Sequence, residues 1–82
     1  MLHLGENVVI PHSKVVAILD IESLGDSEAN LEFLQTAKEE GFVRNITNKA
    51  KSLVITTENI MYLSPISSVT LKSRFEKPYA EF

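Results

Sequence analysis

Two lysines one residue apart, Lys49 and Lys51, are the side chains in this chain that best suit a defined chemistry, the binding of a phosphate backbone. They flank Ala50 in the polar stretch 47–51, which reads as a loop. Alone, such a loop binds DNA weakly, because affinity grows with the number of phosphates that the protein neutralises. Several subunits that present these lysines along one rim would multiply that number and add avidity.

Other residue types with chemical potential have simpler structural explanations. The spacing of His3 and His12 fits no metal-ligand motif, and we expect both to be structural or exposed to solvent. Asp20 ends an apolar strand, where a lone carboxylate usually accepts hydrogen bonds from loop amides. Ser52 has no base or Gly-x-Ser-x-Gly elbow around it. We therefore expect no catalytic residue, no metal, no cofactor and no small-molecule substrate.

The distribution of charge is more informative than its total. The net charge of −3 argues against nucleic acid as a partner. However, residues 1–40 hold eight acids and two bases, a net charge of −6, whereas residues 41–82 hold six bases and three acids, a net charge of +3. This asymmetry is a weak indication of a basic face on an acidic protein.

Length and composition favour a single small domain over residues 1–82. Of the 82 residues 44% are apolar, and none is cysteine, so neither a disulfide nor a thiolate site is possible. The chain opens with no signal-peptide pattern, and no apolar run approaches the roughly 20 residues that span a membrane. We expect a soluble cytoplasmic protein without a membrane partner.

Apolar patterning predicts an α+β domain, with a small, mostly antiparallel sheet, one central helix and a short C-terminal helix. Strands are expected at 2–4, 8–10, 15–19, 42–46, 52–57 and 60–63, and a loop at 21–25. Helices are expected at 27–40 and, as a short C-terminal helix, after Ser64-Pro65. In the longer helix, Asp26 or Ser27 is a suitable N-cap, and Gly41 follows its end. Its broad apolar stripe comprises Leu31, Leu34 and Ala37, with Phe33 at the edge. In the C-terminal helix, Ser64 or Ser67 is a suitable cap, and the apolar residues are Ile66, Val69, Leu71 and Phe75.

The segment Val15–Leu19 is apolar at five consecutive positions. A strand with one solvated face alternates apolar and polar residues, so a continuous run indicates that both faces are covered. A domain of this size has few elements to supply that cover. We therefore expect a second subunit to provide part of it, which makes the protein a homo-oligomer.

Several short segments, in their order and spacing, resemble one known family. These segments are Leu2-His3-Leu4-Gly5, Val15–Asp20, Phe33-Leu34, Lys51-Ser52, Tyr62–Ser67, and Thr70-Leu71 followed by Arg74. Together they resemble the RemA/RemB family of small Firmicute regulators of extracellular matrix and biofilm genes, with the greater likeness to its RemB branch. The resemblance covers nearly the whole chain.

The resemblance implies a small α+β subunit that assembles into rings. It also implies a transcriptional regulator that binds DNA, since the RemA branch activates matrix operons and contacts DNA through arginines on the ring. The arginine that precedes the long apolar strand in that branch falls on Lys14. Its Gly-Arg-Arg loop falls near 48–51, with one residue fewer here. Lysine keeps the charge of arginine but lacks the planar fork that binds phosphate through two hydrogen bonds.

Two functional hypotheses follow. In the first, the protein is a homo-oligomeric regulator of matrix genes that binds the backbone of double-stranded DNA through Lys14, Lys49 and Lys51. Weaker candidates for such contacts are Arg44, Lys72 and Arg74. In the second, the same oligomeric fold is a non-catalytic protein–protein interaction module that modulates a regulator without binding DNA.

Overall fold

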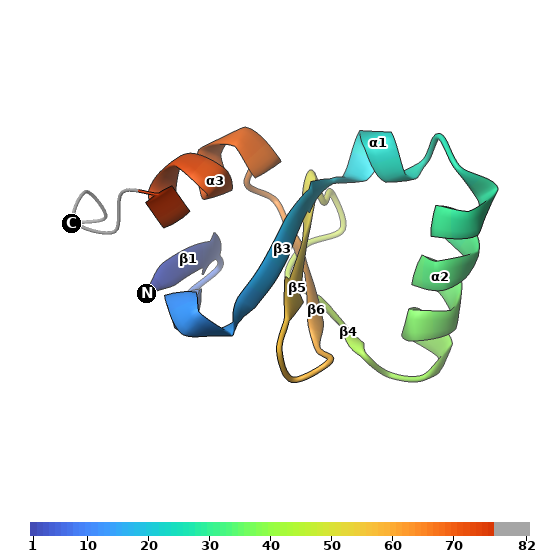
Figure 1. The fold of residues 1–82 in the computed structure, drawn as a ribbon, viewed down its shortest axis with the longest axis horizontal. Coiled ribbons are helices and arrows are strands. Elements are labelled where there is room, and N and C mark those ends of the chain that lie inside the picture. Colours follow the sequence, from blue (N-terminus) through green and yellow to red (C-terminus); the bar gives the residue numbers. More distant parts are fainter. Residues whose placement is uncertain (77–82) are drawn as a thin grey trace.

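The computed structural model describes residues 1–76 and shows an α+β fold (Figure 1). Its strands are β1 (Leu2–Gly5), β2 (Val8–Ile10), β3 (Val15–Asp20), β4 (Val43–Asn45), β5 (Ser52–Thr56) and β6 (Met61–Ser64). Its helices are α1 (Ile21–Leu24), α2 (Glu28–Glu39) and α3 (Ser68–Glu76), and a 3₁₀ turn at His12–Lys14 precedes β3. The predicted fold class is confirmed.

The main sheet has the strand order β3-β5-β6-β4, and β1 and β2 form a separate hairpin. Strands β3, β5 and β6 are antiparallel, whereas the short edge strand β4 runs parallel to β6. The hairpin between β5 and β6 turns at Asn59, which has a positive φ of 62°. Thr56 closes this turn, because its N–H and its Oγ1 both donate to the carbonyl of Ile60, at 3.1 and 2.7 Å.

Two apolar clusters form the core, one on each face of the main sheet. On one face, α3 and the β1–β2 hairpin cover β3 and β5, and the buried members are Leu2, Leu4, Ile10, Ile18, Val54 and Leu71. On the other face, the buried members are Ala37, Leu53, Met61 and Leu63. Figure 1 shows the consequence: α3 and α2 lie at opposite ends of the long axis, with the main sheet between them. The molecule is accordingly elongated, with extents of 37 × 23 × 21 Å.

Helix α2 begins and ends as predicted. The Ser27 hydroxyl caps it by accepting a hydrogen bond from the Asn30 N–H, and Gly41 follows with a φ of +80°. Its apolar stripe is covered only along the middle, however. Ala37 is buried and Leu34 partly so, whereas Leu31 and Phe33 are 49% and 51% exposed.

The expectation of a loop at 21–25 is wrong. Residues Ile21–Leu24 form a single helical turn, α1, because the Asp20 carboxylate accepts hydrogen bonds from the Glu22 N–H and the Ser23 hydroxyl, both at 3.3 Å. This aspartate therefore has the structural role that its position suggested, the satisfaction of local donors.

Of the two caps expected for the C-terminal helix, the structure uses Ser67, and the helix begins at Ser68. Ser67 caps it by accepting from the Thr70 N–H at 3.2 Å, whereas Ser64 ends β6, where its buried hydroxyl donates to the Leu4 carbonyl at 2.7 Å. The face of the helix also differs from the prediction. Leu71 is fully buried, but Val69 is 77% exposed and takes no part in the core.

The apolar run of β3 is less covered than its sequence predicted. A register shift between Val15 and Ala17 indicates a bulge at Val16, whose side chain is 61% exposed. Strand β3 also forms an edge of the main sheet. Of the five apolar residues only Ile18 is buried in the described structure, so the two-sided cover that the run predicts is incomplete.

Gly5, at the end of β1, lies close to Pro65, which follows β6. Replacing Gly5 tests how much this close approach matters for stability. Its φ is +105°, and a Cβ there would lie 2.9 Å from Cγ of Pro65. We expect Gly5→Ala to lower the free energy of unfolding by about 1–3 kcal/mol, through backbone strain and overlap with the proline ring. Urea denaturation measures this change. Gly25→Ala is the matched control, since Gly25 has an ordinary φ of −67°, and an equal loss there would contradict the explanation.

Candidate nucleic-acid interface

The backbone of Lys51 is held firmly at the point where the loop 47–51 enters β5. Its N–H donates to the Ser64 carbonyl at 2.8 Å, and its own carbonyl accepts from the Ile21 N–H at 3.1 Å. These two hydrogen bonds tie the residue to β6 and to α1 while its side chain is exposed. The ammonium group of Lys51 therefore extends from a fixed point on the scaffold.

Lys49 lies in the same loop and is also exposed. The Thr47 hydroxyl accepts a hydrogen bond from the Lys49 N–H at 3.2 Å, which shapes the turn. Between the two lysines, Ala50 packs against the apolar cluster on the α2 face of the sheet. Ala50 packs inward, whereas its two neighbours are exposed, so both positive charges extend from the same loop.

A shallow depression of about 320 Å³ adjoins Lys51 at the start of α3. It is lined by Asp20, Ile21, Glu22, Ala50, Lys51, Ser67, Ser68 and Val69. The lysine charge and the positive end of the α3 dipole both favour an anion there, whereas the carboxylates of Asp20 and Glu22 oppose one. The depression thus has mixed polarity, and the basic character of this region comes from Lys49 and Lys51.

The third predicted DNA contact, Lys14, lies elsewhere on the molecule. Asp20 pairs with Ser52 at one end of β3, and Val15 pairs with Thr56 at the other. Lys14 precedes β3 and Lys51 precedes β5, so the length of a six-residue strand, about 20 Å, separates them. Lys49 and Lys51 share one loop, whereas Lys14 lies at the opposite end of the β3–β5 pair from Lys51.

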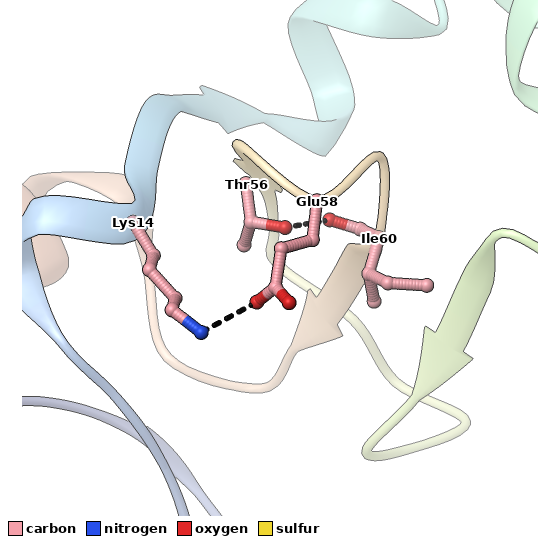
Figure 2. A network of polar contacts seen from close by, with 4 residues as sticks. All are labelled: Lys14, Thr56, Glu58 and Ile60. Carbon is pink, nitrogen blue, oxygen red and sulfur yellow. Dashed lines mark hydrogen bonds and ion pairs between the residues drawn. The ribbon is translucent and has the colours of Figure 1, made fainter.

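Lys14 is also engaged in an ion pair, as Figure 2 shows. Its Nζ donates to Oε1 of Glu58 at 2.7 Å, and the two side chains are 45% and 62% exposed. The carbonyl of Lys14 accepts from the Thr57 N–H at 2.9 Å, so both contacts join the start of β3 to the β5–β6 hairpin. Sequence reasoning missed this pairing, because Glu58 is 44 residues away and no local pattern links the two.

The weaker candidates divide into two kinds. Nη1 of Arg44 donates to the Gly41 carbonyl at 2.8 Å, which gives this arginine a structural role at the end of α2. Lys72 and Arg74 are exposed on α3, at the end of the molecule opposite α2 (Figure 1). Neither lies on the lysine-bearing loop.

Ser52 and His12, two of the residues considered for catalysis or metal binding, make structural contacts, whereas His3 is exposed. Ser52 is fully buried, and its hydroxyl donates to the Ile66 carbonyl at 2.8 Å. The ring of His12 stacks on Phe75 with 5.2 Å between centroids. Within residues 1–76, no three His, Asp or Glu side chains are grouped to hold a metal ion. Over the same residues, every helix is too short or too polar to cross a membrane.

Comparison with known proteins identifies the family. The model of the RemA-like family, described as extracellular matrix regulatory protein A-like, matches residues 1–75. The chain belongs to the RemA-like family. It is also 38% identical over 73 residues to extracellular matrix regulatory protein B of Bacillus subtilis (strain 168). The aligned residues make up 89% of this chain and 86% of that protein. RemA-like proteins are regulators rather than enzymes, and both names indicate a regulator of the extracellular matrix.

Proposed function

We propose that this RemA-like protein is an oligomeric, DNA-binding transcriptional regulator of extracellular matrix genes. It contacts the DNA backbone through Lys49 and Lys51 and, at a second position, through Lys14. The family and the Bacillus subtilis relative support the regulatory role. The contact chemistry is electrostatic, and it needs no catalytic group or cofactor.

The observation that carries this proposal is that Lys49 and Lys51 are exposed on a loop whose backbone is fixed. Both side chains are exposed, while Ala50 packs inward and the backbone of Lys51 is hydrogen-bonded to two elements. A rigid base limits the conformational entropy that is lost when the lysines meet phosphates. The segment 20–40 is acidic, with seven acids and one base, and two of its carboxylates, those of Asp20 and Glu22, line the depression beside Lys51.

Oligomerisation raises the affinity of this small basic loop for duplex DNA above that of a single copy. Each phosphate contact on duplex DNA steepens the dependence of log affinity on log salt by about 0.9. Two lysines on one subunit therefore give a shallow salt dependence and weak binding. A ring that places the same pair on several subunits along one DNA multiplies the contacts and supplies avidity.

An electrophoretic shift series tests the proposal. We expect duplex DNA to be retarded by micromolar protein at low salt, with a log–log salt slope steeper than the −1.8 or so that two contacts allow. A mass measurement on the same samples gives the number of subunits. Failure to shift any duplex at low salt, with the protein assembled, would contradict the proposal.

The Lys14–Glu58 ion pair favours the second hypothesis, a protein interaction module that does not bind DNA. In that case the pair is a structural clamp between β3 and the β5–β6 hairpin, and Lys14 is not available to phosphates. The same shift series distinguishes the two functions, because a module of this kind assembles but leaves DNA unbound at every salt concentration.

Replacing Glu58 tests whether its carboxylate competes with DNA for Lys14. We expect Glu58→Gln to tighten DNA binding about 2–5-fold per assembled particle, because it frees one ammonium group and removes one negative charge. An exposed pair of this kind contributes only about 0.2–1 kcal/mol, so the fold is retained. Fluorescence anisotropy with a labelled duplex measures the change. Glu32→Gln, which removes an exposed charge on α2, is the control, and an equal gain there would attribute the effect to net charge alone.

A further inference from the structure

A second depression, of about 340 Å³, lies where the last two turns of α2 meet the ends of β4 and β6. It adjoins the depression beside Lys51, because Ile21 and Ala50 line both of them. Ligand pockets in proteins have volumes of about 300–1,000 Å³, so this depression is of a size that suits a small molecule rather than a macromolecule.

The polar side chains that line the depression offer donors that the fold does not use. Within residues 1–76, the side chains of Lys38, Asn45 and Asn48 make no hydrogen bond or ion pair. The hydroxyl of Thr47 accepts from the Lys49 N–H, which leaves its own proton available to donate. One ammonium group, two amides and one hydroxyl, from α2, β4 and the loop 47–51, thus border the same space.

The charge of the lining distinguishes this depression from its neighbour. The carboxylates of Asp20 and Glu22 line the neighbouring depression and oppose an anion there. In the depression at α2, Lys38 is the only ionisable side chain among the described lining residues, since Glu39 and Glu40 are outside the lining. The C-terminal end of α2 has a partial negative charge of about half a unit, which is smaller than the full charge of Lys38. The lining therefore favours an oxyanion.

We propose that this depression binds a small phosphate monoester, and that the bound molecule weakens the binding of DNA by the adjoining loop. The ammonium, amide and hydroxyl groups donate to the three terminal oxygens of the phosphate, whereas a carboxylate offers only two oxygens to the same donors. The apolar side chains of the lining, Leu34 and Leu63 among them, contact the organic part of the ligand. The binding site is independent of the proposed function, and its effect on DNA rests on that function.

The loop 47–51 connects the two binding events. Thr47 and Asn48 line the depression, and Lys49 is the next residue along the chain. A bound phosphate monoester brings up to two negative charges close to Lys49, and such charges are felt over about 10 Å at 0.1 M salt. They oppose the approach of a DNA phosphate to the lysine pair. Because such coupling is reciprocal, bound DNA also weakens the binding of the small ligand.

A matched series of three probes tests the site: phenyl phosphate, inorganic phosphate and benzyl alcohol. We expect phenyl phosphate to bind about 5-fold or more tightly than inorganic phosphate, which lacks an organic part, and than benzyl alcohol, which lacks the charge. NMR titration measures the affinities, and the side-chain amide signals of Asn45 and Asn48 are expected to shift. Equal binding of the three probes, or unchanged amide signals, would overturn the proposal.

Replacing Lys38 tests the charged contact. We expect Lys38→Gln to weaken the binding of phenyl phosphate by about 5-fold, with the fold retained because the side chain is exposed. Lys72→Gln is the matched control, since it removes the same charge from an exposed position on α3. An equal loss of affinity in the two variants would attribute the effect to net charge and contradict the assignment of Lys38.

Anisotropy titration with a labelled duplex at constant ionic strength tests the effect on DNA. We expect phenyl phosphate to weaken DNA binding about 2–5-fold in the natural protein and to have no effect in Lys38→Gln. Without the probe, Lys38→Gln is expected to bind DNA within about 2-fold of the natural protein, because Lys38 lies outside the lysine-bearing loop. A larger loss would indicate that a DNA phosphate is the ligand of the depression and would overturn the proposal.

The remaining outcomes separate this proposal from the proposed function. Phenyl phosphate that binds to protein which shifts no duplex would refute the proposed function alone. Protein that binds duplex DNA but not phenyl phosphate would refute only the phosphate site. Binding of both with no change in DNA affinity would refute the coupling between them.

Discussion

Replacing Lys49 and Lys51 together by alanine is expected to abolish DNA binding by the assembled protein. The double change removes the paired charges from every subunit at once, so an assembly in which four subunits touch DNA loses about eight phosphate contacts. Six to ten phosphate contacts are enough for the affinity to change by about 10³–10⁵-fold between 50 and 200 mM salt. We therefore expect the loss of about eight contacts to weaken DNA binding at least 100-fold at 100 mM salt. Anisotropy titration at several salt concentrations measures both the affinity and the slope.

The control for this variant keeps the charge at the same two positions. Lys49→Arg/Lys51→Arg is expected to bind at least as tightly as the natural protein, because arginine can donate two parallel hydrogen bonds to a phosphate. Both lysine side chains are exposed, so neither variant disturbs the core. If the alanine variant retained the natural salt slope, the lysine loop would not be the DNA contact.

Leu71→Ala is expected to destabilise the subunit severely. Leu71 is fully buried and joins α3 to the cluster formed by β1, β2, β3 and β5. A leucine-to-alanine change at such a site costs about 2–5 kcal/mol, through lost burial and the cavity left behind. A chain of 82 residues has a total stability on the order of 4–12 kcal/mol, so much of it is lost. We expect the melting temperature to fall by more than about 10 °C.

Calorimetry measures this change, and all variants are compared at one protein concentration, because self-association would make the melting temperature depend on concentration. Ser73→Ala is the matched control on the same helix, because its side chain is exposed. We expect that variant to remain within about 0.5 kcal/mol of the natural protein. A similar melting temperature for both variants would show that α3 is not part of the cooperative core.

The Lys49→Ala/Lys51→Ala and Leu71→Ala variants distinguish the residues that contact DNA from the residues that stabilise the fold. The lysine loop is expected to change DNA binding without changing stability, and the buried face of α3 to change stability first. The stretch 51–74, which carries much of the family resemblance, is mainly scaffold. Lys51 is held in place by backbone hydrogen bonds to Ser64, at the end of β6, and to Ile21, at the start of α1.

Features with a local cause could be predicted from the sequence. Helix α2 follows from an amphipathic stripe, the Ser27 cap and Gly41, and each of these acts within a few residues. The β5–β6 hairpin follows from two apolar runs around a short polar turn at Asn59. The exposed lysine pair also has a local origin, since Ala50 is apolar and its two neighbours are charged.

Features that depend on distant segments could not be predicted. The pairing of Lys14 with Glu58 joins residues 44 apart, and it arises because β3 lies beside β5. The same strand pairing places Lys14 and Lys51 at opposite ends of β3. Periodicity indicated apolar faces on both main helices but could not show that Val69 and Phe33 would remain uncovered. Side-chain spacing along a helix determines which residues share a face, whereas only the packing of the whole chain determines what covers that face.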